Sequence, residues 1–175
     1  MQALKQFSLP IQGMKIGFHN YTFQLDKSFF SEFENSMFQD GNLSAELNVE
    51  KKSDHLVVDL TFSGTVDTEC NRCTDDIAYP IEEQYDLLIK YDEVPREEDE
   101  IIYLSPESPE FNCAKILYDL VTLSVPIQRT CDEVDNKSCN AEILDRLYNQ
   151  DLTEDNQAEE EDNPFSEALK NLKLN

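Results

Sequence analysis

Residues 43–62, LSAELNVEKKSDHLVVDLTF, decide the fold because apolar and polar residues alternate in them twice, on either side of a polar turn. A period of two is typical of a β-strand with one buried face, and a short polar break between two such runs is typical of an antiparallel hairpin. The apolar members are Leu43, Ala45, Leu47 and Val49, and then Leu56, Val58, Leu60 and Phe62. The stretch therefore predicts a long hairpin with its turn at residues 51–54.

The alternation continues downstream and is then replaced by helical spacing. Residues 77–91 alternate again and extend the hairpin into a meander, and residues 101–104 predict a further short strand. Apolar residues at helical spacing fill residues 113–125, where Pro126 ends the helix, and a second helix is expected over residues 140–148. We expect an α+β fold, an antiparallel β meander packed against one main helix, with short C-terminal helices.

The region before the hairpin predicts shorter elements. Residues 6–24 hold Phe- and Ile-bearing extended runs broken by Pro and Gly, which favours one or two strands. Asp26 is placed to cap a short helix that carries Phe29, Phe30 and Phe33 on one face.

Charge sets limits on function. The 175 residues include 37 Asp and Glu against 14 Lys and Arg, a formal net charge of −23. Extensive binding to a phosphate backbone needs many cations, so this composition excludes a protein that grips RNA or DNA over its whole surface. No apolar run approaches about 18 residues and no signal peptide is recognisable, so we expect a cytoplasmic protein without a membrane span.

The negative charge is concentrated in two segments. Residues 92–110 hold eight acids and one base, and residues 149–164 hold seven acids and no base. Both segments are poor in apolar residues, so we expect a mobile acidic loop at 92–110 and an acidic linker at 149–163. Such charge serves either solvation or the binding of a basic partner. If the charge binds a basic partner, the candidate partner-binding residues of the loop are Glu97, Glu98, Asp99 and Glu100.

We therefore expect a single domain over residues 1–148, followed by the acidic linker and a short amphipathic helix at 164–175. In that last helix, Phe165, Leu169 and Leu172 follow helical spacing after a possible cap at Asn163 and Pro164. Its apolar face either folds back on the core or docks in a groove of a partner.

The five cysteines carry the strongest chemical signal. Cys70 and Cys73 are separated by two residues, a spacing at which both thiolates of a tight knuckle can bind one tetrahedral ion. Cys131 and Cys139 supply a second pair, and four thiolates would form a closed structural zinc site. Ordinary reduced cysteines and a thioredoxin-like redox pair are the alternatives that spacing leaves open. Cys113 lies among apolar helical residues and is expected to be a small buried residue.

Other patterns for catalysis are weak. Neither His19 nor His55 has the neighbouring carboxylates of a zinc hydrolase, and adjacent acids such as Asp75 and Asp76 point to opposite faces of a strand. No Gly-rich phosphate loop and no nucleophile elbow is present in the sequence. The sequence therefore favours a protein that is not an enzyme.

The order of these features resembles the YceD-like family, bacterial and plastid proteins linked to the accumulation and processing of 23S ribosomal RNA. The resemblance rests on short motifs along most of the chain, which are Gly64-Thr65-Val66, the Cys70-x-Arg72-Cys73 knuckle, the acidic loop, Asn112 before a helix running into Leu123-Ser124-Val125-Pro126, a following cysteine, and Asn163-Pro164. Two departures are visible. Many members have a denser cysteine cluster after the proline, and the usual Asp-Pro-Arg near the end is Asn163-Pro164-Phe165 here.

The resemblance implies a non-catalytic factor in ribosomal RNA maturation or large-subunit assembly. Charge adds that such a protein would approach a basic ribosomal protein or a pre-ribosomal particle, with RNA contact confined to a local basic spot such as Arg72, Lys51 and Lys52. A metal-dependent nuclease acting on precursor RNA and a general acidic chaperone of basic proteins are the alternatives.

Overall fold

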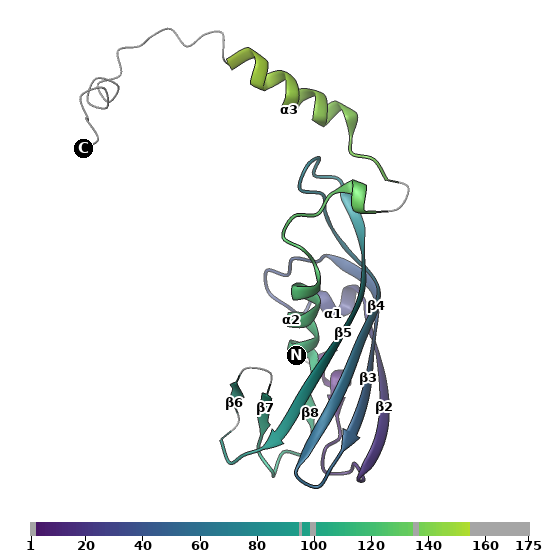
Figure 1. Ribbon diagram of the computed structural model, residues 1–175, viewed down its shortest axis with the longest axis vertical. Helices are drawn as coiled ribbons and strands as arrows, with labels where there is room; N and C mark the ends of the chain where they lie inside the picture. Colours follow the sequence, from purple (N-terminus) through teal and green to yellow (C-terminus); the bar gives the residue numbers. More distant parts are fainter. Residues whose placement is uncertain (1–2, 95, 99–100, 135–136, 155–175) are drawn as a thin grey trace, which may run out of the picture.

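A computed structural model gives the fold of the chain and describes residues 3–94, 96–98, 101–134 and 137–154. The fold is α+β, with two short 3-10 helices (η1 and η2) beside the α-helices and strands (Figure 1). In chain order the elements are η1 (Ala3–Phe7), β1 (Ser8–Leu9), β2 (Gly17–Leu25), α1 (Lys27–Phe30), β3 (Asp40–Lys51), β4 (His55–Glu69), β5 (Asp76–Tyr91), β6 (Arg96–Glu98), β7 (Ile101–Leu104), β8 (Phe111–Asn112), α2 (Ala114–Ser124), η2 (Cys131–Glu133) and α3 (Ala141–Glu154).

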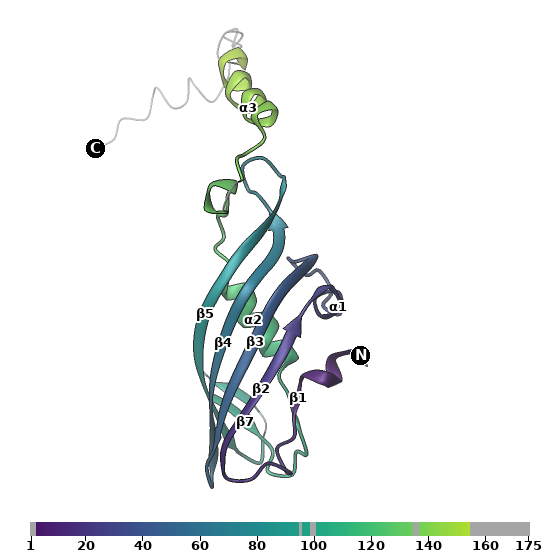
Figure 2. The same cartoon turned by 90° about the vertical axis from the view of Figure 1, so that its right-hand side faces the viewer.

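A six-stranded sheet in the order β2-β3-β4-β5-β7-β6 forms the body of the molecule. Its four long strands lie side by side and antiparallel, as Figure 2 shows. The predicted hairpin is confirmed, because Leu47 lies opposite Leu60 and the backbone N–H of Lys52 donates to the His55 carbonyl across the turn at 2.9 Å. The alternation over 77–91 also forms a strand, β5, so the meander is confirmed.

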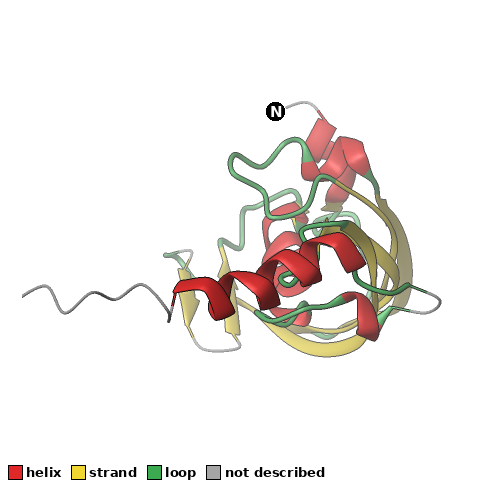
Figure 3. Cartoon of the chain, turned by 90° about the horizontal axis from the view of Figure 1, so that it is seen from above, coloured by secondary structure: helices red, strands yellow, loops and turns green. Residues whose placement is uncertain are grey.

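One face of the sheet builds the core. Seen from above, the strands curve in an arc (Figure 3). The apolar residues of the two alternating runs are all buried, and the same core cluster includes Phe29 and Phe30 of α1 and Leu117 and Val121 of α2. Mostly polar residues of β3 and β4, with Val57 among them, form the opposite face, as the period of two predicted.

Helix α1 begins where the sequence predicted. The carboxylate of Asp26 accepts hydrogen bonds from the backbone N–H groups of Ser28 (2.9 Å) and Phe29 (3.3 Å), which the first turn of a helix leaves without partners. These bonds, with that of the Ser28 hydroxyl as the largest contribution, hold the pKa of Asp26 below its usual value. The cap directs Phe29 and Phe30 into the core.

The acidic segment at 92–110 contains the strand expected at 101–104 and also β6, a short strand that the sequence did not predict. Strands β6 and β7 lie within it, and β7 pairs with β5 in parallel while β6 pairs with β7 antiparallel. Ile102 of β7 is buried in the main core, and this apolar contact offsets the entropy of ordering a polar segment. The strand expected at 101–104 is confirmed as β7.

The C-terminal part also differs from the expectation. Helix α3 continues to Glu154, so the first residues of the predicted acidic linker are helical. The remainder of that linker and the predicted helix at 164–175, with Phe165, Leu169 and Leu172, lie outside the described residues. None of the described helices is long and apolar enough to span a membrane.

Candidate metal centre

The hairpin of β4 and β5 extends beyond the rest of the sheet. The first residue of β3, Asp40, lies opposite Asp67, so the end of β4 and the start of β5 form a two-stranded ribbon. We call residues 68–76 the tip. Its turn is closed by hydrogen bonds from Cys70 N–H to the Asp75 carbonyl and from Thr74 N–H to the Cys70 carbonyl, each 2.9 Å. Thr74 takes a left-handed conformation with φ of 61°, which a β-branched residue rarely adopts. This tight turn points Cys70 and Cys73 to the same side.

The segment between α2 and η2, residues 125–130, folds back over the tip. Asn71 N–H donates to the Arg129 carbonyl, and Arg129 N–H donates to Oδ1 of Asn71, both at 2.9 Å. The guanidinium of Arg129 donates through Nε to the Thr68 hydroxyl at 2.8 Å. These three bonds hold the segment against the tip two residues before Cys131. The sequence did not identify Asn71 or Arg129, because no periodicity marks them.

The structure brings together all four predicted cysteine ligands. Their Sγ atoms lie within 4.8 Å of one another, with 3.8 Å between Cys70 and Cys139 and 3.6 Å between Cys73 and Cys131. Four sulfurs at about 2.3 Å from a tetrahedral Zn²⁺ are separated by about 3.8 Å, whereas a disulfide needs about 2.05 Å. The described geometry therefore fits a four-thiolate metal site.

The site lies in a small apolar cluster of its own. Cys70, Cys73, Ile77 and Cys131 are buried together, and Cys139 is half-buried. Burial opposes the thiolate of Cys70, but the backbone N–H groups of Cys73, Arg72 and Cys131 outweigh it and lower the pKa of Cys70 to about 6. Burial instead raises the pKa values of Cys131 and Cys139. A bound cation would stabilise the deprotonated form of all four cysteines, so these residues are suitable as a set of metal ligands.

Cys113 lies apart from this cluster. It is buried at the start of α2, where its Sγ donates to the Phe7 carbonyl at 2.8 Å. Burial raises the pKa of this thiol to about 12. The expectation of a small buried residue at this position is confirmed.

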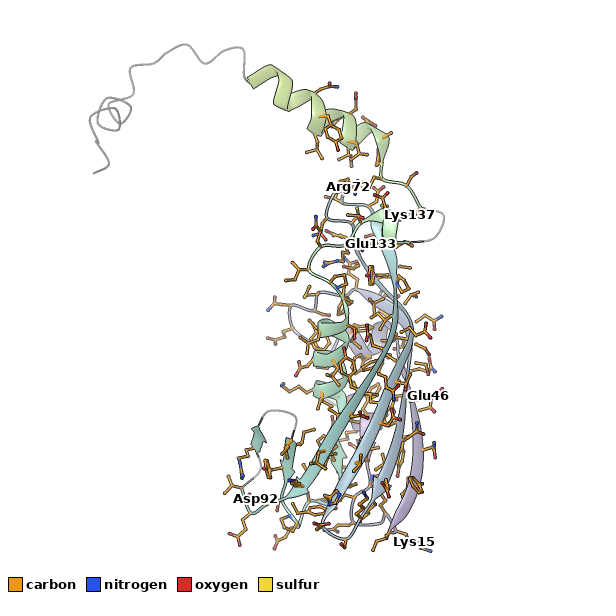
Figure 4. All side chains as sticks on the ribbon, in the orientation of Figure 1. Lys15, Glu46, Arg72, Asp92, Glu133 and Lys137 are labelled. Atoms are coloured by element: carbon orange, nitrogen blue, oxygen red, sulfur yellow. The ribbon has the colours of Figure 1, made fainter. Side chains whose placement is uncertain are left out.

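Arg72 does not share a basic spot with Lys51 and Lys52, which corrects that expectation. Arg72 lies at the tip and pairs with Asp132 at 2.8 Å, whereas the two lysines lie at the other end of β4, about 45 Å away along a 15-residue strand. Figure 4 labels Arg72 near Glu133 and Lys137 at one end of the molecule and Lys15 at the opposite end.

The remaining candidates are separate from the cysteines. Glu97 and Glu98 belong to β6 at the edge of the sheet, whereas Asp99 and Glu100 lie outside the described residues. His19 contacts the Lys15 carbonyl and His55 pairs with Asp54 at 2.8 Å. Among the described residues, the group suited to a metal contains no histidine.

Comparison with known proteins identifies the family. The model of the family described as large ribosomal RNA subunit accumulation protein YceD matches residues 58–173, well over half of the chain. The chain belongs to the YceD family. The YceD match begins within β4 and includes the tip and all four clustered cysteines. No curated protein and no solved structure matches the chain. The resemblance noted from the short motifs is thereby confirmed.

Proposed function

We propose that this chain is a non-catalytic factor that supports 23S ribosomal RNA accumulation through processing of that RNA or assembly of the large subunit. The observation that carries the proposal is the match to the YceD family, whose name refers to the accumulation of the large-subunit RNA. The formal net charge of −23 supports contact with a basic protein of the subunit, or of its precursor particle, instead of extensive contact with RNA.

The acidic segment around β6 is the proposed contact with this partner. Strand β6 lies at one edge of the sheet order, beside β7, and carries Glu97 and Glu98. Asp99 and Glu100 follow directly in the sequence. Glu97 and Glu98 at a sheet edge, with two further acids next in the sequence, would raise the association rate with a basic surface and select against acidic partners.

The proposed metal is Zn²⁺ in a structural role. Four thiolates at tetrahedral separation complete the coordination of Zn²⁺ and leave no open position for water or substrate. The ion would supply folding free energy by joining the tip to a segment about sixty residues later in the chain. A structural ion of this kind is consistent with a protein that binds a partner, and it would take part in no catalytic step.

Affinity purification of the tagged chain from cells tests the partner. We expect a basic large-subunit protein or precursor particle to be recovered at low salt and lost progressively as salt increases. The variant Glu97→Lys/Glu98→Lys should lose the partner. Its control, Glu82→Lys/Glu83→Lys, makes the same charge change at exposed acids of β5 and should retain it.

Two outcomes would contradict the proposal. Equal loss of the partner in both double variants would show that only total charge matters, as for a general acidic chaperone. Cleavage of precursor ribosomal RNA by the pure protein with Mg²⁺ would instead identify the nuclease alternative.

A further inference from the structure

Over residues 141–149, helix α3 buries few of its side chains. Figure 1 shows it extending away from the tip. Of its residues 141–149, only Ile143 and Leu144 are partly buried, whereas Leu147 and Tyr148 are 48 % and 68 % exposed. Ile143 packs on the apolar cluster that surrounds the cysteines. Within residues 141–149, burial of apolar side chains therefore fixes α3 near its first turn.

The first turn of α3 adjoins a cluster cysteine. Cys139 precedes Asn140, whose Oδ1 accepts from the backbone N–H of Glu142 at 3.0 Å and caps the helix. The approach to Cys139 is held by Lys137, whose Nζ donates to the Asp76 carbonyl at the tip. A ligand bond to Cys139 would therefore set the position of the cap and of Ile143 together.

A helix of this length needs such an anchor. Isolated helices shorter than about 12–15 residues are marginal in water, and α3 has 14 residues with little tertiary packing. The other three ligands belong to the tip and to the segment that Arg129 holds against it, so they have hydrogen-bonded supports independent of α3. Of the four ligands, Cys139 is thus the one whose bond to the metal would do most to keep α3 ordered.

We propose that the metal bound by the four cysteines is the joint that fixes α3 to the sheet. With the metal bound, α3 is held by its first turn against the tip. Without the metal, Cys139 is released, the cap loses its position and α3 frays. The inference rests on the proposed metal centre and is independent of the proposed ribosomal role.

Hydrogen exchange of the full chain tests this joint without any partner. Protein loaded with one equivalent of Zn²⁺ is compared with protein stripped by a chelator under reducing conditions. We expect backbone amides of 143–149 to be protected from exchange with Zn²⁺ and to lose that protection without it. Amides of β3 and of the part of β4 that pairs with β3 should stay protected in both samples. Equal exchange of α3 with and without Zn²⁺, or failure to bind Zn²⁺, would overturn the proposal.

Substitutions separate the joint from general destabilisation. Cys139→Ser and Ile143→Ala should each increase exchange in α3 in the presence of Zn²⁺. Leu147→Ala, in the same helix but exposed, and Cys113→Ser, in the main core, should leave α3 protected. Loss of protection in the Leu147→Ala variant to the same extent as in Ile143→Ala would contradict anchoring through the cysteine cluster.

Discussion

Single residues of this chain have separable roles, and the two kinds of cysteine show this most clearly. Cys113 has a buried thiol with a pKa raised to about 12, while Cys70 is held in a turn whose N–H groups lower its pKa to about 6. Burial disfavours the thiolate of Cys113, whereas the several backbone N–H groups around Cys70 outweigh burial and favour its thiolate, so we expect Cys70 to be the more reactive of the two.

Thiol labelling checks this difference. If the cluster holds a metal, we expect an alkylating reagent at neutral pH to modify Cys70 first after treatment with a chelator, and to leave Cys113 unmodified until the protein unfolds. Zn²⁺ should protect the cluster. Peptide mass spectrometry identifies the sites, and early labelling of Cys113 would show that this thiol is accessible in the folded protein.

The cap of α1 gives a prediction about stability. Replacing Asp26 with Ala should lower the free energy of unfolding by about 1 kcal/mol at pH 7, measured by urea denaturation, because two backbone N–H groups lose their acceptor. Asp26→Asn should retain most of the stability, since Asn caps almost equally well.

The effect of Asp26→Ala should depend on pH. The folded-state pKa of Asp26 lies below its usual value of 3.8, so the carboxylate stabilises the fold above that pH, and the benefit disappears as the pH falls through the folded value. The difference in stability between the two proteins should become smaller at acidic pH. A difference that stays constant down to low pH would contradict capping by the charged group.

At the scale of elements, the alternating residues of β3 and β4 were sufficient to predict the sheet, because each run buries one face whatever its neighbours are. The parallel pairing of β7 with β5 was not predictable, since no local pattern encodes which distant strand becomes a neighbour. The spacing of seven residues between Cys131 and Cys139 exceeded that of a usual zinc knuckle. The 3-10 helix η2 takes up the first of these residues, and the longer spacing still brings Cys131 and Cys139 into one cluster.

A glycine in β4 controls the approach of β3. Gly64 has φ of +140°, and a Cβ there would lie 2.2 Å from the Asn42 carbonyl oxygen. Gly64→Ala should therefore lower the free energy of unfolding by about 3 kcal/mol or more, seen as a lower urea midpoint. Gly13→Ala is the matched control and should change stability little, since no atom lies within 4 Å of its added Cβ. A change in stability for Gly64→Ala as small as that for Gly13→Ala would show that strand β4 tolerates the side chain.

At the scale of the whole molecule, charge works against compactness. With 37 acids and 14 bases, the folded chain repels itself more than the unfolded chain does. Raising NaCl from 10 to 150 mM shortens the screening length from about 30 to about 8 Å, so we expect the melting temperature to increase. Differential scanning calorimetry measures it, and a lower melting temperature with added salt would mean that attractive ion pairs outweigh the repulsion.

The sequence indicated four cysteines as candidate metal ligands but not how the folded chain brings them together. Cys70 and Cys73 could be recognised from their spacing, whereas their approach to Cys131 depends on Asn71 and Arg129, two polar residues that meet only in the folded chain.

The separation between the main core and the cysteine cluster has a practical consequence for anyone preparing this protein. The sheet closes its own apolar core without any of the four clustered cysteines. A sample without metal in the proposed cysteine site would therefore still show the circular dichroism of a β-sheet protein. The metal content of each batch needs to be measured before a failed binding experiment is interpreted.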